Sequence, residues 1–191
     1  IMDLIVKWSD SYPLGQVIFF RGFFGVLLYF LIMPRDRIKN FYYTKRPGLH
    51  FLRCFFGLIA LLAIFTALRN LPLATVVSIS FAAPIFTTIL SIFLLNEKVR
   101  LFRWLAVIVG FIGIIIITEP GFASLNIYFI YPVIFCLGMS YVAITIRQLS
   151  TSEPVWLISL YFSATITLAS FFTIPYGWIM PDIKDLMLLM S

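Results

Sequence analysis

The chain has 191 residues, of which 62% are apolar and only 12% are charged, and its formal net charge is +6. A soluble globular domain has about 25% charged and 45–50% apolar residues, so this composition excludes a water-soluble fold. The mean hydropathy of +1.05 is spread along the whole chain, which also excludes a soluble domain held by one membrane anchor. We therefore interpret the chain as an all-α, polytopic membrane protein embedded in a lipid bilayer. The basic residues lie in short gaps between apolar runs, so we expect no nucleic-acid partner.

Apolar runs long enough to cross the ~30 Å hydrocarbon core as helices recur along the chain. Short gaps separate them, and most gaps contain a proline, which is typical of a helix end. The first run is only the end of a helix and the last only the start of one, so we expect a fragment of a longer protein with about seven spans. The predicted spans are 1–8, 14–33, 49–69, 73–95, 102–118, 125–146, 155–175 and a start at 183.

Basic residues are concentrated on one side of these spans. Eight of the fourteen lysines and arginines lie in the gaps 34–50 and 96–103, and Arg147 begins the gap 147–154. The opposite gaps are poor in basic residues. By the positive-inside rule, these three gaps are predicted to face the cytoplasm.

Charged residues within the spans are candidates for function, because each costs about 2.5 kcal/mol or more to insert. Asp3 and Arg21 fall at similar depths on neighbouring antiparallel helices. We interpret them as an ion pair or as two poles of a substrate site, with Lys7 nearer the mouth, and a purely structural pair is the alternative. Arg53 either snorkels to the headgroups or contacts Glu97, as a gate-like latch or an ordinary salt bridge.

The span 73–95 carries the main uncharged feature. Pro84 lies near its middle and has no amide hydrogen, so the carbonyl of Ser80 loses its helical partner and needs water, a hydroxyl or a ligand. Polar residues follow at helical spacing and form one stripe, which lines a cavity or holds helices together; we favour the cavity. The stripe consists of Ser80, Pro84, Thr87 or Thr88, and Ser91.

Signatures of enzymes and metal sites are missing. We find no G-x-S-x-G, H-E-x-x-H or phosphate-binding loop, and we expect neither an enzyme nor a cofactor. His50 is the only histidine, and we interpret it as interfacial. Cys54 and Cys136 lie in apolar runs and are read as small buried hydrophobic residues. A small-residue face on the next span suits close packing within the chain or in a homodimer; it consists of Ala106, Gly110 and Gly113.

A weak internal repeat indicates two halves of opposite topology. Lys7 stands six residues before Pro13, and Arg147 stands seven before Pro154, five spans later. An odd number of spans in each copy inverts the second one, which is the plan of many secondary transporters. The alternative is that membrane hairpins simply resemble one another.

Several of these stretches resemble EamA-type transporters of the drug/metabolite transporter superfamily. The family's first hairpin is resembled by two stretches, Asp3 to Lys7 and Phe19-Phe20-Arg21. The rest of its first repeat is resembled by Leu71 to Val77 through Pro84, Asn96-Glu97-Lys98, Arg103-Trp104 and Gly110 to Gly113. The resemblance implies a ten-helix carrier of two inverted five-helix repeats, with a central cavity and alternating access. We assign 1–120 to the first repeat and 121–191 to part of the second, in which Phe162 replaces the equivalent of Arg21.

Within that family, the sequence pattern most resembles that of carriers for S-adenosylmethionine. The residues that carry this resemblance are Lys45-Arg46-Pro47, His50, Arg53 and Asn96-Glu97. The resemblance thus implies a secondary transporter of a small polar or zwitterionic metabolite in the bacterial inner (plasma) membrane, with a membrane-embedded enzyme or a non-transporting scaffold as alternatives. The expected substrate pathway comprises Asp3, Lys7, Arg21, Ser80, Pro84 and Thr88, and the expected latch comprises Arg53 and Glu97.

Overall fold

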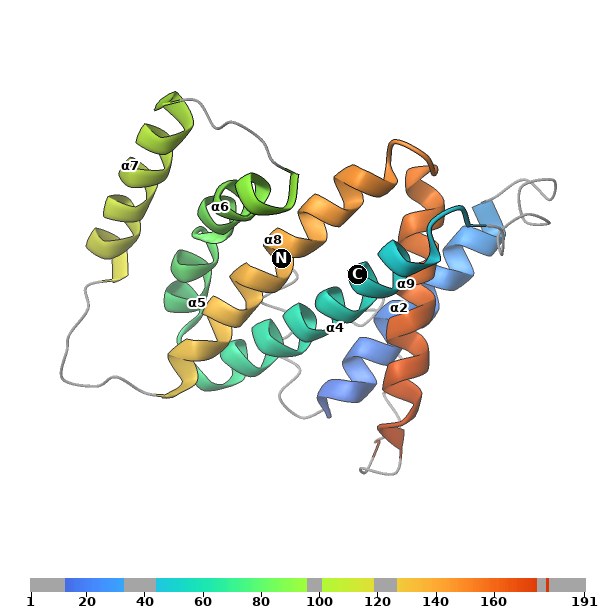
Figure 1. The fold of residues 1–191 in the computed structure, drawn as a ribbon. Coiled ribbons are helices and arrows are strands. Elements are labelled where there is room, and N and C mark those ends of the chain that lie inside the picture. The colour runs from blue at the N-terminus through green and yellow to red at the C-terminus, as the bar shows by residue number, and fades with distance from the viewer. Residues whose placement is uncertain (1–12, 33–43, 96–100, 119–126, 175–177, 179–191) are drawn as a thin grey trace. The chain divides into compact units, whose positions relative to one another are not determined.

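The chain folds into helices in the computed structural model, which describes residues 13–32, 44–95, 101–118, 127–174 and 178 (Figure 1). Within these ranges there is no β-strand. The helices in chain order are α2 (Leu14–Ile32), α4 (Pro47–Asn70), α5 (Leu73–Ser80), α6 (Ala83–Leu95), α7 (Leu101–Thr118), a 3-10 turn η2 (Ile127–Phe129), α8 (Ile130–Leu149) and α9 (Val155–Phe171).

The helices coincide with the predicted spans wherever the structure describes the chain. Three segments are long and apolar enough to cross a membrane: Pro47–Asn70, Leu73–Leu95 and Ile127–Leu149. Shorter apolar helices lie within α2, α7 and α9. The prediction of an all-helical chain with several membrane-crossing segments is therefore confirmed for the described residues.

Prolines mark where several helices begin. Pro47 is the first residue of α4. Pro72 and Pro154 directly precede α5 and α9, with backbone φ/ψ of −58°/139° and −71°/144°. A proline at a helix start removes no helical hydrogen bond, because the first amides of a helix have no acceptor within it. Proline would break a helix in its interior, but at these positions it marks where the helix begins.

The predicted span 73–95 is confirmed as Leu73–Leu95, but at Pro84 it is divided into two helices rather than bent within one. Residues 81 and 82 form a turn, and Pro84 is the second residue of a new helix, α6. The chain breaks here because the proline ring clashes with the carbonyl four residues earlier and offers it no donor. Placing Pro84 in the first turn of α6 removes this conflict, since no helical acceptor exists there for its amide.

Side chains of α8 contact carbonyl groups on both sides of this break. The Cys136 thiol lies 3.3 Å from the carbonyl oxygen of Ile79 and 3.8 Å from that of Ser80. One turn further on, the Ser140 hydroxyl donates to the carbonyl of Ala83 at 2.9 Å. The predicted need for a partner at the Ser80 carbonyl is thus met by a thiol, and Cys136 is not only a buried apolar residue.

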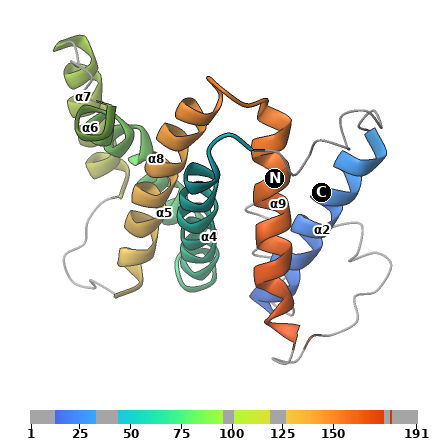
Figure 2. The same ribbon diagram turned by 45° about the vertical axis from the view of Figure 1, so that its right-hand side comes forward.

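The chain divides into two compact units, one formed by 1–54 with 146–191 and the other by 55–145. In the first unit, α2 packs against α9, and the two helices lie side by side in both views (Figures 1 and 2). Gly22 permits this approach, because a Cβ there would lie 3.0 Å from the backbone oxygen of Ser163. These units are groups of packed helices rather than sequence repeats, so the proposed repeat boundary near 120 stays a prediction.

In the second unit, close packing between α4 and α8 also depends on a glycine. A Cβ added to Gly138 would lie 2.9 Å from the Ala60 Cβ and 3.1 Å from the Phe56 carbonyl oxygen. The ring of Phe56 packs against Tyr141, with centroids 4.1 Å apart. Small residues let helix backbones approach closely, which is the main source of helix association in lipid.

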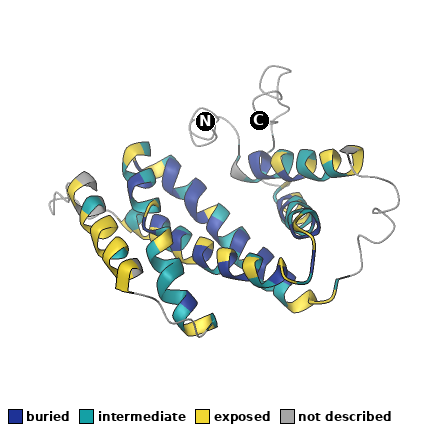
Figure 3. Cartoon of the chain, turned by 90° about the horizontal axis from the view of Figure 1, so that it is seen from above, coloured by how far each residue is buried: buried dark blue, intermediate teal, exposed yellow. Residues whose placement is uncertain are grey.

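Helix α7 presents most of its apolar side chains to the outside, as its predominantly exposed colouring shows (Figure 3). Gly110 and Gly113 on this helix have no neighbour within 4 Å of an added Cβ. The small-residue face predicted from the sequence therefore makes no close packing contact within the described part of the chain at its two glycines.

We predict that Gly138→Ala destabilises the protein by about 1–3 kcal/mol, because the methyl group must displace either Ala60 or the backbone of Phe56. The matched control is Gly48→Ala, at an exposed helical position where an added Cβ meets nothing within 4 Å. Thermal unfolding of the detergent-purified full-length protein measures both. Equal melting temperatures for the two variants would contradict this account of the α4–α8 contact.

Candidate functional site

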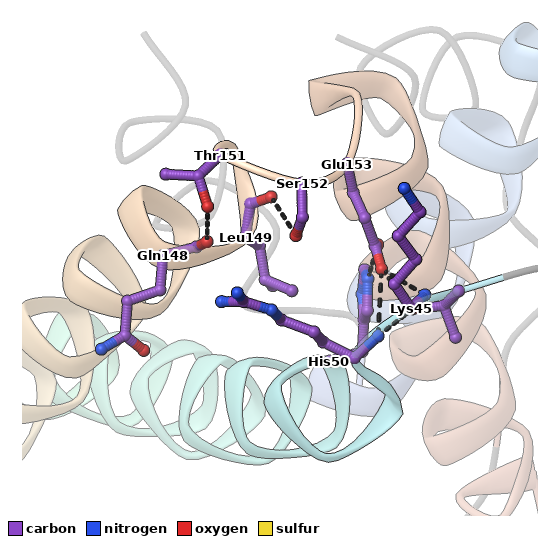
Figure 4. Close-up of polar contacts among 9 residues, drawn as sticks. Lys45, His50, Gln148, Leu149, Thr151, Ser152 and Glu153 are labelled. Carbon is purple, nitrogen blue, oxygen red and sulfur yellow. Dashed lines mark hydrogen bonds and ion pairs between the residues drawn. The ribbon is translucent and has the colours of Figure 1, made fainter.

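Glu153 is the centre of a polar cluster in the first unit. It lies in the turn between α8 and α9, and its side chain is buried (Figure 4). Its Oε1 accepts hydrogen bonds from the Thr44 hydroxyl at 2.5 Å, the Lys45 amide at 2.8 Å and the Arg46 amide at 3.3 Å. A carboxylate at this position also faces the positive end of the α4 dipole. Glu153 therefore binds the residues that lead into α4, which begins at Pro47.

His50, in the first turn of α4, completes the cluster. Its Nε2 contacts Oε2 of Glu153, and its ring lies against that of Tyr161 on α9, with centroids 4.6 Å apart. Both His50 and Glu153 are buried within this unit, and the interfacial depth of His50 in the membrane stays a prediction. Within the described part of the chain no group of three or more His, Cys, Asp or Glu residues could hold a metal ion.

The pKa of Glu153 lies below its usual range. Burial by itself disfavours the charged carboxylate, but hydrogen bonds from Thr44, His50 and the Lys45 amide, together with attraction to His50, outweigh it. Glu153 is therefore a carboxylate at neutral pH, and its charge is part of the fold of this unit.

Arg53 lies one turn further along α4, and its guanidinium carbon sits 4.0 Å from the centre of the Phe162 ring on α9. The residue is only 7% exposed, so it does not snorkel to the headgroups as one interpretation held. Its Nε and Nη1 are buried and have no hydrogen-bond partner among the described residues. A cation over an aromatic face gains about 0.5–2 kcal/mol, whereas each unsatisfied buried donor costs about 1–3 kcal/mol. The contact with Phe162 by itself does not offset the free-energy cost of burying the Arg53 guanidinium with unpaired donors.

The other predicted site residues are only partly described. Asp3, Lys7 and Glu97 lie outside the described residues, so the Asp3–Arg21 pair and the Arg53–Glu97 latch stay predictions. Arg21 is exposed on α2.

The residues of the predicted polar stripe bond within their own helices. Ser80 and Thr88 each donate to the carbonyl four residues earlier, at 2.7 and 2.9 Å, and Pro84 is exposed. These hydroxyls are therefore hydrogen-bonded within their own helices.

Sequence reasoning missed Glu153 and the contact that Phe162 makes. Glu153 is the only acidic residue between 120 and 181, and it directly precedes Pro154, the proline before α9. A lone carboxylate at a helix boundary is a signal that could have found it. Phe162 was named from the sequence only as the residue in place of the Arg21 equivalent, and only the fold places it over Arg53.

Comparison with known proteins gives consistent results. The sequence model of the EamA-like transporter family matches residues 3–119. Two proteins named S-adenosylmethionine uptake transporter are similar to this chain over 182 residues, which are 91% of it. The protein from Rickettsia prowazekii is 33% identical, and the match covers 59% of its length. The protein from Rickettsia bellii is 34% identical, and the match covers 60% of its length. A pseudopaline exporter of Pseudomonas aeruginosa is 28% identical over 182 residues, 93% of this chain and 62% of that protein. The chain thus spans about three fifths of these relatives. No solved structure matches it.

We predict that Glu153→Gln lowers the stability of the protein by about 1.5–3 kcal/mol at neutral pH, because charge-assisted hydrogen bonds to the residues before α4 are lost. Since folding lowers the pKa of Glu153, its stabilisation is complete above the usual glutamate range and disappears as the pH falls through the depressed value.

Melting temperatures of the full-length protein, measured from neutral pH downward, check both parts of this prediction. The melting temperature of the wild type should exceed that of Glu153→Gln at neutral pH, and this difference should disappear at acid pH. Thr151→Ala is the matched control, because this exposed hydroxyl in the same turn bonds only to the carbonyl of Gln148 (Figure 4). A gap between wild type and Glu153→Gln that is constant down to acid pH would contradict the role of the charge.

Proposed function

Because the chain belongs to the EamA-like transporter family, we propose that its protein is a secondary active transporter of a small polar or zwitterionic metabolite. The chain is part of a multi-pass bacterial membrane protein, and we place it in the inner membrane. The observation that carries the proposal is Arg53, a cation buried within an apolar helix and against an aromatic ring. Charged groups at such positions are retained when they serve a substrate or ion pathway.

The proposed substrate is S-adenosylmethionine or an amino-acid-like compound. This is supported by relatives that carry the name S-adenosylmethionine uptake transporter and cover nine tenths of the chain. The pseudopaline exporter, with similar coverage of the chain, has a name that states the opposite direction. The proposal therefore concerns the class of substrate and leaves the direction of transport open.

The proposed mechanism is alternating access between two inverted five-helix repeats, of which this chain supplies the first and part of the second. The break between α5 and α6 is a suitable hinge, because the turn at 81–82 has fewer helical hydrogen bonds to lose when the chain bends. A thiol bonds the freed carbonyls, and thiols are weak donors, so these contacts exchange at low cost. Asp3, Lys7 and Arg21 remain the proposed charged groups of the pathway.

Self-association is a separate part of the proposal. The face formed by Ala106, Gly110 and Gly113 is our candidate contact for a homodimer, supported by the open space around both glycines. It does not bear on the transport mechanism.

Uptake measurements test the proposed function. The full-length protein, reconstituted in vesicles, should accumulate radiolabelled S-adenosylmethionine faster than empty vesicles, and unlabelled S-adenosylmethionine should compete. Vesicles that hold an unrelated membrane protein are the control for leakage. No uptake of S-adenosylmethionine or of any amino acid above that control would contradict the proposal.

We predict that Pro84→Ala slows the transport cycle about 3- to 10-fold with a smaller change in substrate affinity. Alanine restores the amide donor to the Ser80 carbonyl, which favours a continuous and less bendable helix over 73–95. Initial rates over substrate concentration, normalised to folded protein in the membrane, separate the two parameters.

The matched control for this variant is Pro72→Ala, because that proline precedes α5 and its replacement restores no interior hydrogen bond. An unchanged maximal rate per folded molecule of Pro84→Ala would mean that the break only shapes helix packing.

A further inference from the structure

We propose that the guanidinium of Arg53, held against the ring of Phe162, is the binding site for the carboxylate of the transported substrate. This inference rests on the proposed transport function and adds the chemical group that the site recognises. It replaces the latch interpretation of Arg53 with a role in substrate binding.

The first argument is the number of hydrogen-bond donors that Arg53 leaves unused. Its Nε carries one N–H and its Nη1 carries two, so three of the five guanidinium donors are buried without an acceptor among the described residues. Buried polar groups are normally hydrogen-bonded, and an exception in a native fold calls for an explanation. A ligand that supplies oxygen acceptors provides one.

The second argument is the absence of a counter-charge in the described part of the chain. Glu153 is the only carboxylate there, and it is already engaged by Thr44, the amides of Lys45 and Arg46, and His50. The groups that interact electrostatically with Arg53 are Cys54, which also shares a side-chain hydrogen bond with it, and Tyr29; neither is a carboxylate. Within the described residues, the positive charge of Arg53 is therefore not paired with a carboxylate.

The third argument is the geometry around the guanidinium. The ring of Phe162 covers its face at 4.0 Å, and this contact restrains the plane of the group. The N–H donors of a guanidinium point outward along its edges, so the ring on its face does not use these donors. Two carboxylate oxygens fit such an edge in a bidentate pair. Phe162 is thus a positioning residue for Arg53.

The surroundings favour a carboxylate over a phosphate. A single guanidinium balances one negative charge, and among the described residues no second cation contacts Arg53. A phosphate dianion would remain incompletely neutralised in this apolar setting. The inferred ligand is a carboxylate-bearing zwitterion, a class that includes S-adenosylmethionine.

Two ligands that differ only in this group test the inference directly. Binding of S-adenosylmethionine and of its decarboxylated analogue is measured by calorimetry on the detergent-purified full-length protein. The wild type should bind S-adenosylmethionine about 10- to 100-fold more tightly, and Arg53→Gln should reduce this preference to near one. Arg53→Lys should recover only part of it, since an ammonium cannot form the bidentate pair.

Arg147→Gln is the matched control, because it removes an exposed positive charge from the same unit and should leave the preference unchanged. Equal affinity of the wild type for the two ligands, or an equal loss of both in Arg53→Gln, would overturn the inference and leave the proposed transport function intact.

A second measurement needs no ligand, so it remains decisive if S-adenosylmethionine is not the substrate and the proposed function itself fails. If Arg53 waits for an anion, Arg53→Gln relieves a buried charge, and the ligand-free protein should melt at the same temperature as the wild type or higher. If Arg53 instead pairs with Glu97, both Arg53→Gln and Glu97→Gln should lower the melting temperature, and the double variant should lower it by less than their sum. A marked loss of stability or of folding in Arg53→Gln overturns the inference.

Discussion

Every polar backbone group of this chain that lies in hydrocarbon needs a partner supplied by the protein, and this constraint shapes each of its helices. Hydroxyl groups within the helices mostly bond to carbonyls one turn earlier, as Thr66 does to Leu62. Where Pro84 forces the chain to start a new helix, the Cys136 thiol on α8 contacts the freed carbonyl of Ser80, and Ser140 donates to the carbonyl of Ala83. Pro84 thus causes the break between α5 and α6, and side chains of α8 provide hydrogen-bond donors beside it.

The same constraint acts more severely on charges, and the chain treats its two best-described buried charges differently. Glu153 is surrounded by donors and joins the turn after α8 to the start of α4. Arg53 has an aromatic ring on its face and unused donors at its edges. A carboxylate with both oxygens engaged is suited to a structural role, whereas a cation with unused donors is suited to a ligand that binds and dissociates. Glu153 and Arg53 belong to the same unit. Glu153 binds the residues before α4, and α4 is the helix that carries Arg53.

Close helix packing depends on small residues, and here the sequence and the structure point to different ones. The pattern on α7 singled out Gly110 and Gly113, which have open space around them. The tight approaches within the described helices occur instead at Gly138 on α8 and Gly22 on α2. A glycine that faces lipid and a glycine that faces another helix are identical in the sequence, because both sit among apolar residues. The direction each faces is decided by the packing of distant segments.

The sequence by itself determined the all-helical membrane architecture and nearly all helix boundaries, because hydropathy and proline act over a few residues and need no knowledge of the rest of the fold. It also supplied the family resemblance and singled out Arg53 and Pro84 as candidate site residues. Only the tertiary structure decided what these residues contact. His50 and Glu153 are 103 residues apart, and Arg53 meets Phe162 from a different helix. Such pairs arise when α4 and α9 fold into one unit, and no local spacing in the chain encodes them.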